Sequence, residues 1–163
     1  MEERFELLTQ MVWGVHGNVQ RLKTDIAAAL GIKSAHVFLI YLLRKYPQGL
    51  TAAELGELNR STDGLISRET AALLQQGIIT TDKESERRRY GCKYLLTEKG
   101  RGIAARIADF AMHVQHQADV DLTEEDLRVF YRTFAILLRN FDGITGKQHL
   151  NEYKERKGDD KWE

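Results

Sequence analysis

The sequence has very little of several features that would mark a particular class of protein. Its one cysteine, Cys92, has no intrachain partner for a disulfide, which favours a reducing, cytoplasmic setting. No hydrophobic run approaches the roughly 20 residues that a membrane span needs. The first residues, MEERFELL, are acidic and charged, unlike a secretory signal. These absences predict a soluble intracellular protein.

The formal net charge of the chain is zero, because 24 Lys and Arg residues balance 24 Asp and Glu residues. A neutral total argues against nonspecific coating of nucleic acid, although it can hide a local basic patch. The single proline, Pro47, and the long periodic segments favour a mostly helical fold. With 163 residues, 42% of them hydrophobic, the chain can form one ordinary domain with its own core.

The N-terminal segment carries one long apolar stripe. Its members recur at steps of three and four residues: Phe5, Leu8, Val12, Val15, Val19, Leu22, Ile26 and Leu30. The stripe predicts a helix of about 25 residues, roughly 38 Å long, which Gly31 ends. A small domain cannot cover a helix of that length, so we expect part of the stripe to meet a second chain. The alternative is a helix packed wholly within its own subunit.

Residues 34–60 predict two further helices. Ser34 is the expected N-cap of a helix that is apolar almost all round and therefore central, and Tyr46 with Pro47 stops it. Residues 51–54, which read TAAE, form a capping box that opens the third helix.

A fourth helix and two strands follow. Ser61 or Thr62 is expected to cap the fourth helix, which ends at Gly77. Strand-like patterns cover residues 77–81 and 90–96, with a charged loop between them. The order predicts a winged helix-turn-helix: mainly α with a small β-hairpin wing (α+β).

Two more helices are expected after the hairpin. Thr97 caps the fifth, and Thr123 caps the sixth, which opens with acidic residues. The apolar face of the sixth helix is wide and consists of Leu127, Phe130, Tyr131, Phe134, Leu137, Leu138 and Phe141. Residues 143–163 are charged and rich in glycine, so we expect a mobile C-terminal tail with a short helix near 150–157.

The first turns of the fourth helix are suited to DNA. The residues that we expect to contact it are Ser61, Thr62, Asp63, Gly64, Leu65, Ser67 and Arg68. Small residues let the helix backbone approach a groove, hydroxyls bond to phosphates or base edges, and an arginine can bind guanine with two hydrogen bonds. The other face holds Leu65, Ala72 and Leu73, which would pack on the third helix through Leu55 and Leu58. The alternative is that the polar residues only cap the helix and face solvent.

The hairpin tip, residues 83–89, reads KESERRR. Arg87, Arg88 and Arg89 suit phosphate groups and narrow minor grooves, and they lie just after the candidate reading helix. Glu84 and Glu86 dilute the positive field, and a charged loop that only faces solvent is the alternative.

Residues 5–141 resemble the MarR family of bacterial regulators. The matching motifs are LTAAELGEL, SRETAALLQQGII, an arginine-bearing wing and LTEKG, followed by LTEED at the last helix. The resemblance implies one MarR-like domain over residues 1–142, with a winged core at about 34–96. It also implies a two-fold homodimer built from helices at about 3–30 and 98–141, with reading helices in major grooves and wing arginines in flanking minor grooves. The wing departs from the family pattern, which has Asp, any residue, then Arg; here the nearest match, Glu86-Arg87-Arg88, lies about two residues too far upstream.

Family members often hold a small anionic aromatic or phenolic ligand between the dimer helices and the DNA-binding lobe. The candidate residues for such a pocket are Trp13, His16, His36, Tyr41 and Phe110, and the alternative is ordinary packing. His113 and His116 could share a metal, but with Asp119 or His16 they give no complete ligand set, so no cofactor or metal is predicted. Cys92 is expected to be a small packing residue, with oxidative release from DNA as a lesser hypothesis.

Together these patterns predict a sequence-specific DNA-binding transcriptional regulator, a homodimeric repressor at a palindromic operator that a small ligand modulates. The alternative is a winged-helix protein-interaction module that has lost DNA binding, which the neutral charge and the acids Asp63, Glu69, Glu84 and Glu86 would favour. The sequence contains no phosphate-binding glycine loop, no GxSxG and no HExxH, so we do not predict an enzyme.

Overall fold

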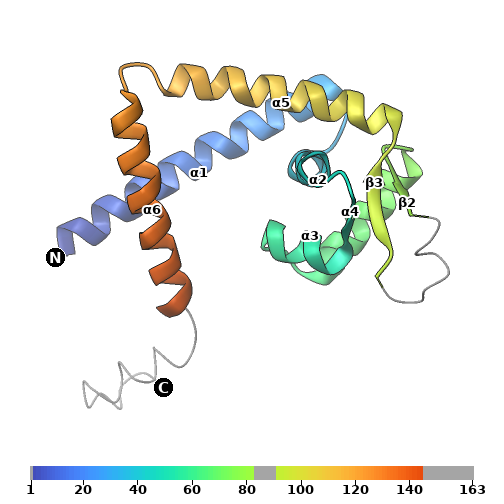
Figure 1. The fold of residues 1–163 in the computed structure, drawn as a ribbon, viewed down its shortest axis with the longest axis horizontal. Coiled ribbons are helices and arrows are strands. Elements are labelled where there is room, and N and C mark those ends of the chain that lie inside the picture. The colour runs from blue at the N-terminus through green and yellow to red at the C-terminus, as the bar shows by residue number, and fades with distance from the viewer. Residues whose placement is uncertain (1, 83–90, 145–163) are drawn as a thin grey trace, which may run out of the picture. The chain divides into compact units, whose positions relative to one another are not determined.

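The computed structural model describes residues 2–82 and 91–144, which belong to two compact units, Met1–His116 and Gln117–Glu163. The element order is α1 (Glu2–Leu30), α2 (Ser34–Lys45), β1 (Leu50–Thr51), α3 (Ala52–Asn59), α4 (Asp63–Gln75), β2 (Ile79–Thr81), β3 (Lys93–Leu96), α5 (Glu98–Ala118) and α6 (Glu124–Ile144) (Figure 1). The expected fold class, mainly helical with a small antiparallel sheet, is confirmed.

Helix α2 is the centre of the first unit, as its all-round apolar sequence predicts. It contacts α1, α3, α4 and β3, and Figure 1 shows it end-on with α3 and β3 beside it. Its buried residues are His36, Val37, Leu39, Ile40, Leu42 and Leu43. They join Leu55 of α3, Ile66 and Leu73 of α4 and Ile78 in one core. The same core includes residues of α1 and α5, so it holds the helix-turn-helix against these two helices.

The sheet has three strands in the order β1-β3-β2, whereas the sequence predicted a two-stranded hairpin. The missed strand, β1, pairs Leu50 with Tyr94, and it is too short at two residues to show any periodicity. Gly49 makes the pairing possible: its φ is +83°, and a Cβ there would lie 2.9 Å from the Tyr94 carbonyl oxygen. Strand β3 begins at Lys93, later than the predicted residue 90.

The predicted helix ends are mostly confirmed. Gly31 and Gly77 follow α1 and α4 with φ of +65° and +63°, and the capping box at the start of α3 is complete. The prediction that Ser34 caps α2 is wrong. Extended Lys33 holds the N-cap position, its carbonyl accepts from the His36 N–H, and Ser34 is already helical.

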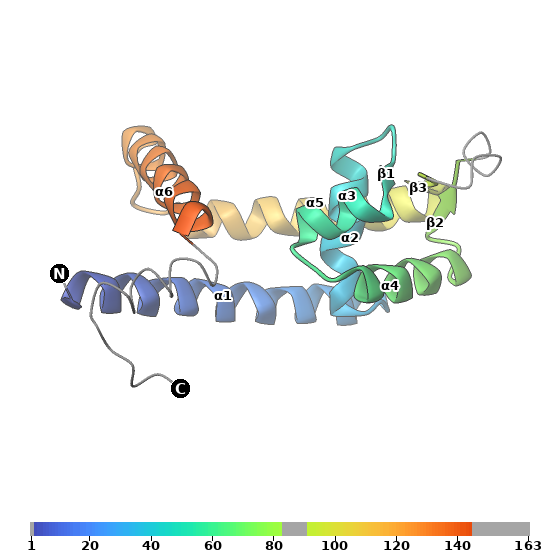
Figure 2. The ribbon, with the colours of Figure 1, turned by 90° about the horizontal axis from the view of Figure 1, so that it is seen from below.

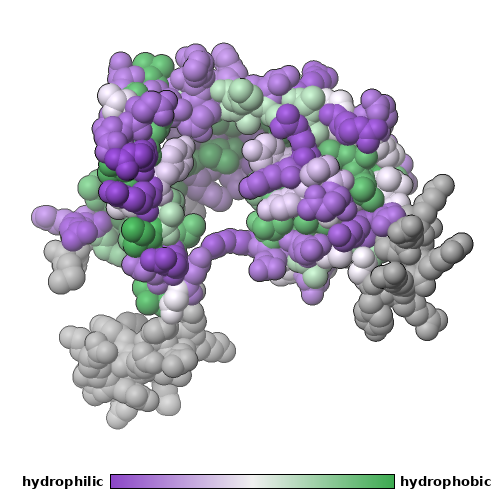
Figure 3. Space-filling model, viewed as in Figure 1, coloured by the Kyte–Doolittle hydropathy of each residue, from purple (hydrophilic) through white to green (hydrophobic). Residues whose placement is uncertain are grey.

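The long helices leave apolar side chains uncovered in each unit. In the first unit, Phe5, Leu7, Met11, Val12, Trp13, Val15 and Val19 of α1 are exposed, whereas Ala27 is buried against the core. In the second unit, α6 has no buried residue, and Val129, Phe130, Tyr131, Phe134, Ile136 and Leu138 are exposed. Figure 3 shows hydrophobic side chains, in green, reaching the surface along α6.

Within the described ranges, no helix by itself is long and apolar enough to cross a membrane. Helices α1 and α2 meet the length and composition test only as a pair, with a bend of 88° between them.

Candidate nucleic-acid interface

The turn between α3 and α4 is compact and internally bonded. Arg60 adopts a left-handed conformation with φ of 50°, and its N–H donates to the Glu57 carbonyl. The Ser61 N–H donates to the Gly56 carbonyl at 2.9 Å, so the last carbonyls of α3 are satisfied. A Cβ at Gly56 would lie 3.7 Å from the Ile66 side chain, which shows how closely the two helices approach.

Helix α4 has one buried face and one exposed face. Ile66, Glu69, Thr70 and Leu73 are buried, at the spacing that places them on one side of a helix. The predicted DNA-contacting residues divide accordingly: Thr62, Asp63, Gly64, Ser67 and Arg68 are exposed, whereas Ser61 and Leu65 are half-buried. Figure 2 shows α4 beside α3, with its far end leading into β2.

The hydroxyls on this face differ in their availability. The Ser61 Oγ accepts from the Asn59 side-chain amide at 2.6 Å and donates to the Asn59 carbonyl, so it serves the turn. Thr62 is the N-cap residue, as predicted, but its side chain makes no capping hydrogen bond. Among the described residues, neither Thr62 Oγ1 nor Ser67 Oγ has a hydrogen-bond partner, so both can bond to a ligand.

Arg68 is connected to the core through its neighbour. Its Nε donates to Glu69 Oε1 at 3.0 Å. The other carboxylate oxygen, Oε2, accepts from Nε2 of His36 at 3.1 Å, and the ammonium of Lys33 lies 3.9 Å away. Glu69 is 5% exposed and His36 is wholly buried.

The protonation states of this group follow from its surroundings. The Arg68 hydrogen bond, with Lys33 and His36, holds the pKa of Glu69 below its ordinary value, so it is a carboxylate. Burial lowers the pKa of His36, despite the raising effect of Glu69. His36 is therefore neutral at pH 7, with its proton on Nε2, and its buried Nδ1 has no partner among the described residues.

The C-terminal end of α4 is fastened to α5 by two side chains, Thr97 and Lys99. Lys99 Nζ donates to the carbonyl of Gln76, the C-cap residue of α4, at 2.8 Å. Thr97 Oγ1 donates to the Gly77 carbonyl at 2.8 Å and accepts from the Gly100 N–H at 3.0 Å, as the expected cap of α5 does. The Thr97 N–H donates to the Ile78 carbonyl. Helix α4 is thus anchored at both ends, by the turn after α3 and by this junction.

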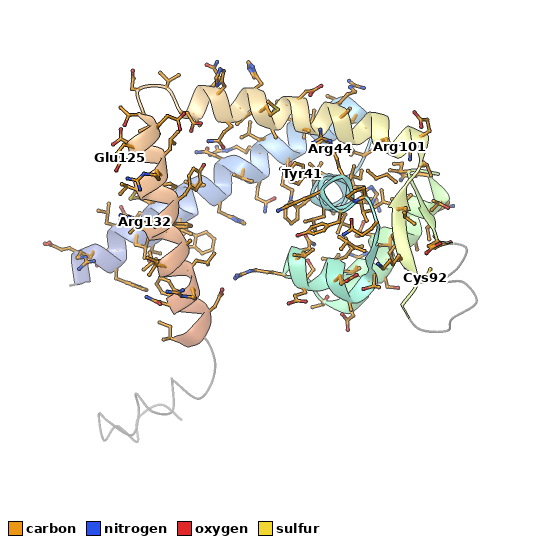
Figure 4. The ribbon with its side chains drawn as sticks, in the orientation of Figure 1. Tyr41, Arg44, Cys92, Arg101, Glu125 and Arg132 are labelled. Carbon is orange, nitrogen blue, oxygen red and sulfur yellow. The ribbon has the colours of Figure 1, made fainter. Side chains whose placement is uncertain are left out.

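The wing is described in part. Strands β2 and β3 pair Ile79 with Leu96 and Thr81 with Tyr94. The predicted DNA-contacting residues Arg87, Arg88 and Arg89 lie outside the described residues. Cys92 is a half-buried free thiol that directly precedes β3 (Figure 4).

The five residues expected to line a ligand pocket lie in different environments. Trp13 and His16 are exposed on α1 with their rings edge to face, and Tyr41 is stacked on Phe38 on the surface of α2. His36 is buried in its pair with Glu69. Phe110 alone of the five lines a groove of about 190 Å³ between α1, α2 and α5, with Val19, Leu22, Ile26, Val37, Ile107 and Val114.

A second cavity, of about 280 Å³, lies between α2, β3 and α5. Leu43, Pro47, Leu95 and Leu96 line it together with Arg44 and Arg101, whose positions on α2 and α5 Figure 4 shows. In the parts of the chain that the structure describes, no group of three His, Cys, Asp or Glu side chains could hold a metal ion.

The sequence analysis counted Glu69 among the acids that would favour a protein-interaction module, but its side chain is buried and offers no such surface. The signal was present: Ile66, Thr70 and Leu73 repeat at steps of four and three, and Glu69 falls inside that stripe. A carboxylate in a buried stripe requires a cationic or hydrogen-bonding partner. The one buried titratable residue of α2, His36, supplies it.

Comparisons with known proteins place the fold. No family model and no curated protein sequence matches the chain. A MarR transcriptional regulator from Methanosarcina mazei Go1 is similar in structure, with a TM-score of 0.72 and 16% identity over 86% of this chain and 92% of that one. A MarR family regulator from Silicibacter pomeroyi has a TM-score of 0.69 at 19% identity, over 80% and 86% of the two chains. A further MarR family regulator has a TM-score of 0.74 at 21% identity, over 88% and 96%. The chain therefore has the fold of the MarR family transcriptional regulators.

Proposed function

We propose that this protein is a sequence-specific DNA-binding transcriptional regulator of the MarR family, a homodimeric repressor that binds a palindromic operator. The observation that carries the proposal is the exposed polar face of α4. It presents an arginine, unbonded hydroxyls and a glycine on a helix that is anchored at both ends. A helix in this setting is the right size for the major groove.

Gly64 adds to this argument. Nothing lies within 4 Å of the Cβ that a larger residue would carry there, and the backbone is ordinary helix. A glycine in an exposed helix costs about 1 kcal/mol relative to alanine, and local packing gives no reason for it. Close approach of the α4 backbone to a groove wall is the reason we assign.

The exposed apolar residues of α1 and of α6 support a homodimer. Each helix leaves several large hydrophobic side chains in water, and patches of this kind mark association surfaces. Two reading helices related by a two-fold axis would take half-sites about one helical turn, roughly 34 Å, apart.

The same proposal includes a small aromatic or phenolic effector. The groove that Phe110 lines lies between α1, α2 and α5, where a bound ligand would bias the packing of these three helices. A ligand that favours a different spacing of the two reading helices would lower DNA affinity by population shift. A phenolic acid should then weaken operator binding, and no effect at about millimolar concentration would contradict this part of the proposal.

Selection of bound sequences from a random duplex pool, at a stated salt concentration, tests the function directly. We expect an enriched imperfect palindrome. Equal retention of scrambled duplexes would refute sequence-specific binding, and capture of a protein partner with no retained duplex would favour an interaction module.

A single substitution separates folding from DNA binding. Gly64→Leu should leave the protein at least as stable, because leucine is the better helix former and meets open space. It should weaken operator binding at least about tenfold, because the side chain would stand between α4 and the groove. Gly102→Leu on α5, which also meets open space, is the matched control. If Gly64→Leu binds the operator with wild-type affinity, the exposed face of α4 does not contact DNA.

A further inference from the structure

The buried carboxylate of Glu69 connects His36, in the core around α2, to Arg68 on the exposed face of α4. Adjacent residues on a helix diverge by about 100°, so Arg68 and Glu69 do not face each other by default. Their contact of 3.0 Å therefore requires the Arg68 side chain to bend back toward the buried edge of α4. This fixes the direction of the longest side chain on the reading face.

The carboxylate of Glu69 is held in place by residues of α2 and of the segment before it. His36 Nε2 on α2 donates to Oε2 at 3.1 Å, Lys33 approaches the same oxygen at 3.9 Å, and Oε1 remains for Arg68. These three are the cationic or titratable groups that the structure places on Glu69. Exposed ion pairs contribute little because both partners must be ordered when they meet. Here the carboxylate is already ordered, so only Arg68 loses freedom.

Glu69 binds Arg68 through Nε, and this leaves the other edge of the guanidinium available to a base. A guanidinium has one edge that includes Nε and another formed by Nη1 and Nη2. Glu69 takes Nε, and among the described residues Nη1 and Nη2 have no hydrogen-bond partner. The free edge carries the two parallel donors that match O6 and N7 of a guanine.

From this geometry we infer that Glu69 is a positioning residue of the DNA-reading surface, which holds Arg68 with its Nη edge outward so that it reads one guanine of each half-site. The inference rests on the proposed function and adds a specificity determinant that does not itself touch DNA. Because Glu69 is acidic, it reduces general attraction to phosphate while it increases discrimination between bases.

The test compares the full-length wild type, Glu69→Gln, Arg68→Ala and the double variant on the operator from the random-duplex selection and on a scrambled duplex. Glutamine keeps the size of the side chain and an acceptor for His36, but it loses the charge that holds Arg68. We expect Glu69→Gln to lower the ratio of operator to scrambled affinity by about three- to tenfold, with unchanged or tighter binding to scrambled DNA. In the Arg68→Ala background the same change should leave the ratio within about twofold.

Glu98→Gln is the matched control, because it also removes the carboxylate partner of an arginine, Arg101, but both residues belong to α5 and not to the exposed face of α4. Its specificity ratio should equal that of the wild type. If Glu69→Gln lowers the specificity ratio equally with and without Arg68, Glu69 acts through the fold. If the ratio is unchanged in the single variant, Arg68 does not depend on Glu69 for its orientation. Either result overturns the inference while DNA binding by the wild type upholds the proposed function. If the wild type enriches no duplex, the proposed function fails and the inference fails with it.

A second readout needs no DNA. The ¹⁵N relaxation of the Arg68 Nε–H reports its motion on the picosecond to nanosecond scale. We expect an ordered Nε–H in the wild type and a mobile one in Glu69→Gln, with Arg101 unchanged between the two. A mobile Arg68 Nε–H in the wild type would contradict the positioning role.

Discussion

Gly100 lies in the first turn of α5, against the backbone of Ile78. A Cβ built on it would lie 2.0 Å from the Ile78 carbonyl oxygen and 3.2 Å from Leu96 Cδ2. Real Cβ atoms keep about 3 Å from such an oxygen, so alanine requires the junction to open by about 1 Å. That opening strains the hydrogen bonds through which Thr97 joins Gly77 and Ile78.

We expect Gly100→Ala to reduce the free energy of unfolding by about 2–4 kcal/mol. The estimate takes about 2 kcal/mol for the three weakened hydrogen bonds together, plus overpacking of about 1–3 kcal/mol, less the roughly 1 kcal/mol that alanine gains as a helix former. Urea unfolding followed by circular dichroism measures it, and the melting temperature should fall by roughly 5–15 °C.

Gly102→Ala is the control for this prediction. It lies two residues further along α5, and nothing is within 4 Å of its Cβ position, so it should stabilise the protein by about 0.5–1 kcal/mol. If Gly100→Ala unfolds at the same urea concentration as Gly102→Ala, the close contact with Ile78 is refuted as the reason for a glycine at this position.

Three further predictions concern the caps, the buried pair and the surface of α6. Thr51→Ala removes the capping box of α3 and should cost about 1 kcal/mol in urea unfolding; no change would show that the box contributes nothing. Because burial lowers the pKa of His36, its neutral form stabilises the fold above about pH 6.5, and this stability should be lost as the pH falls below that value. His36→Gln should reduce the change in the free energy of unfolding between about pH 7.5 and 5.5. If this change is the same as in the wild type, other groups cause it. Phe134→Asp places a charge on the exposed face of α6 and should convert a dimer into a monomer in light scattering after size-exclusion chromatography; a persistent dimer would remove α6 from the interface.

Much of the fold was predictable because its signals are local. The stripe along α1, the capping box at Thr51 and the glycines after α1 and α4 each act within a few residues of their own position. The prediction at Ser34 failed because a serine before an apolar run suits the first helical position as well as the N-cap, and only the backbone angles of Lys33 decide between them. Strand β1 was not predictable by periodicity, since its partner Tyr94 lies more than 40 residues away in the sequence.

The candidate site divides in the same way. The exposed face of α4 follows from helical spacing, so the availability of Thr62 and Arg68 was within reach of the sequence. The role of Glu69 was not, because it depends on His36, which lies 33 residues earlier and meets it only when α2 packs on α4. The helical stripe could have shown that Glu69 is internal, but only its partner reveals what the buried carboxylate binds.

The bonds of Thr97 have a mechanical consequence. The hydroxyl and the amide of Thr97 and the ammonium of Lys99 donate to the carbonyls of residues 76–78, and these bonds join the end of α4 to the start of α5. At Gly100 the two backbones are too close to admit a Cβ atom. From this junction α5 continues as one unbroken helix, and its residues up to His116 belong to the same unit as α4. Because the contacts join the two helices directly, we expect a tilt of α5 to move α4 with it. A ligand bound along α5 would then change the position of α4, the helix that we propose reads DNA, without touching it.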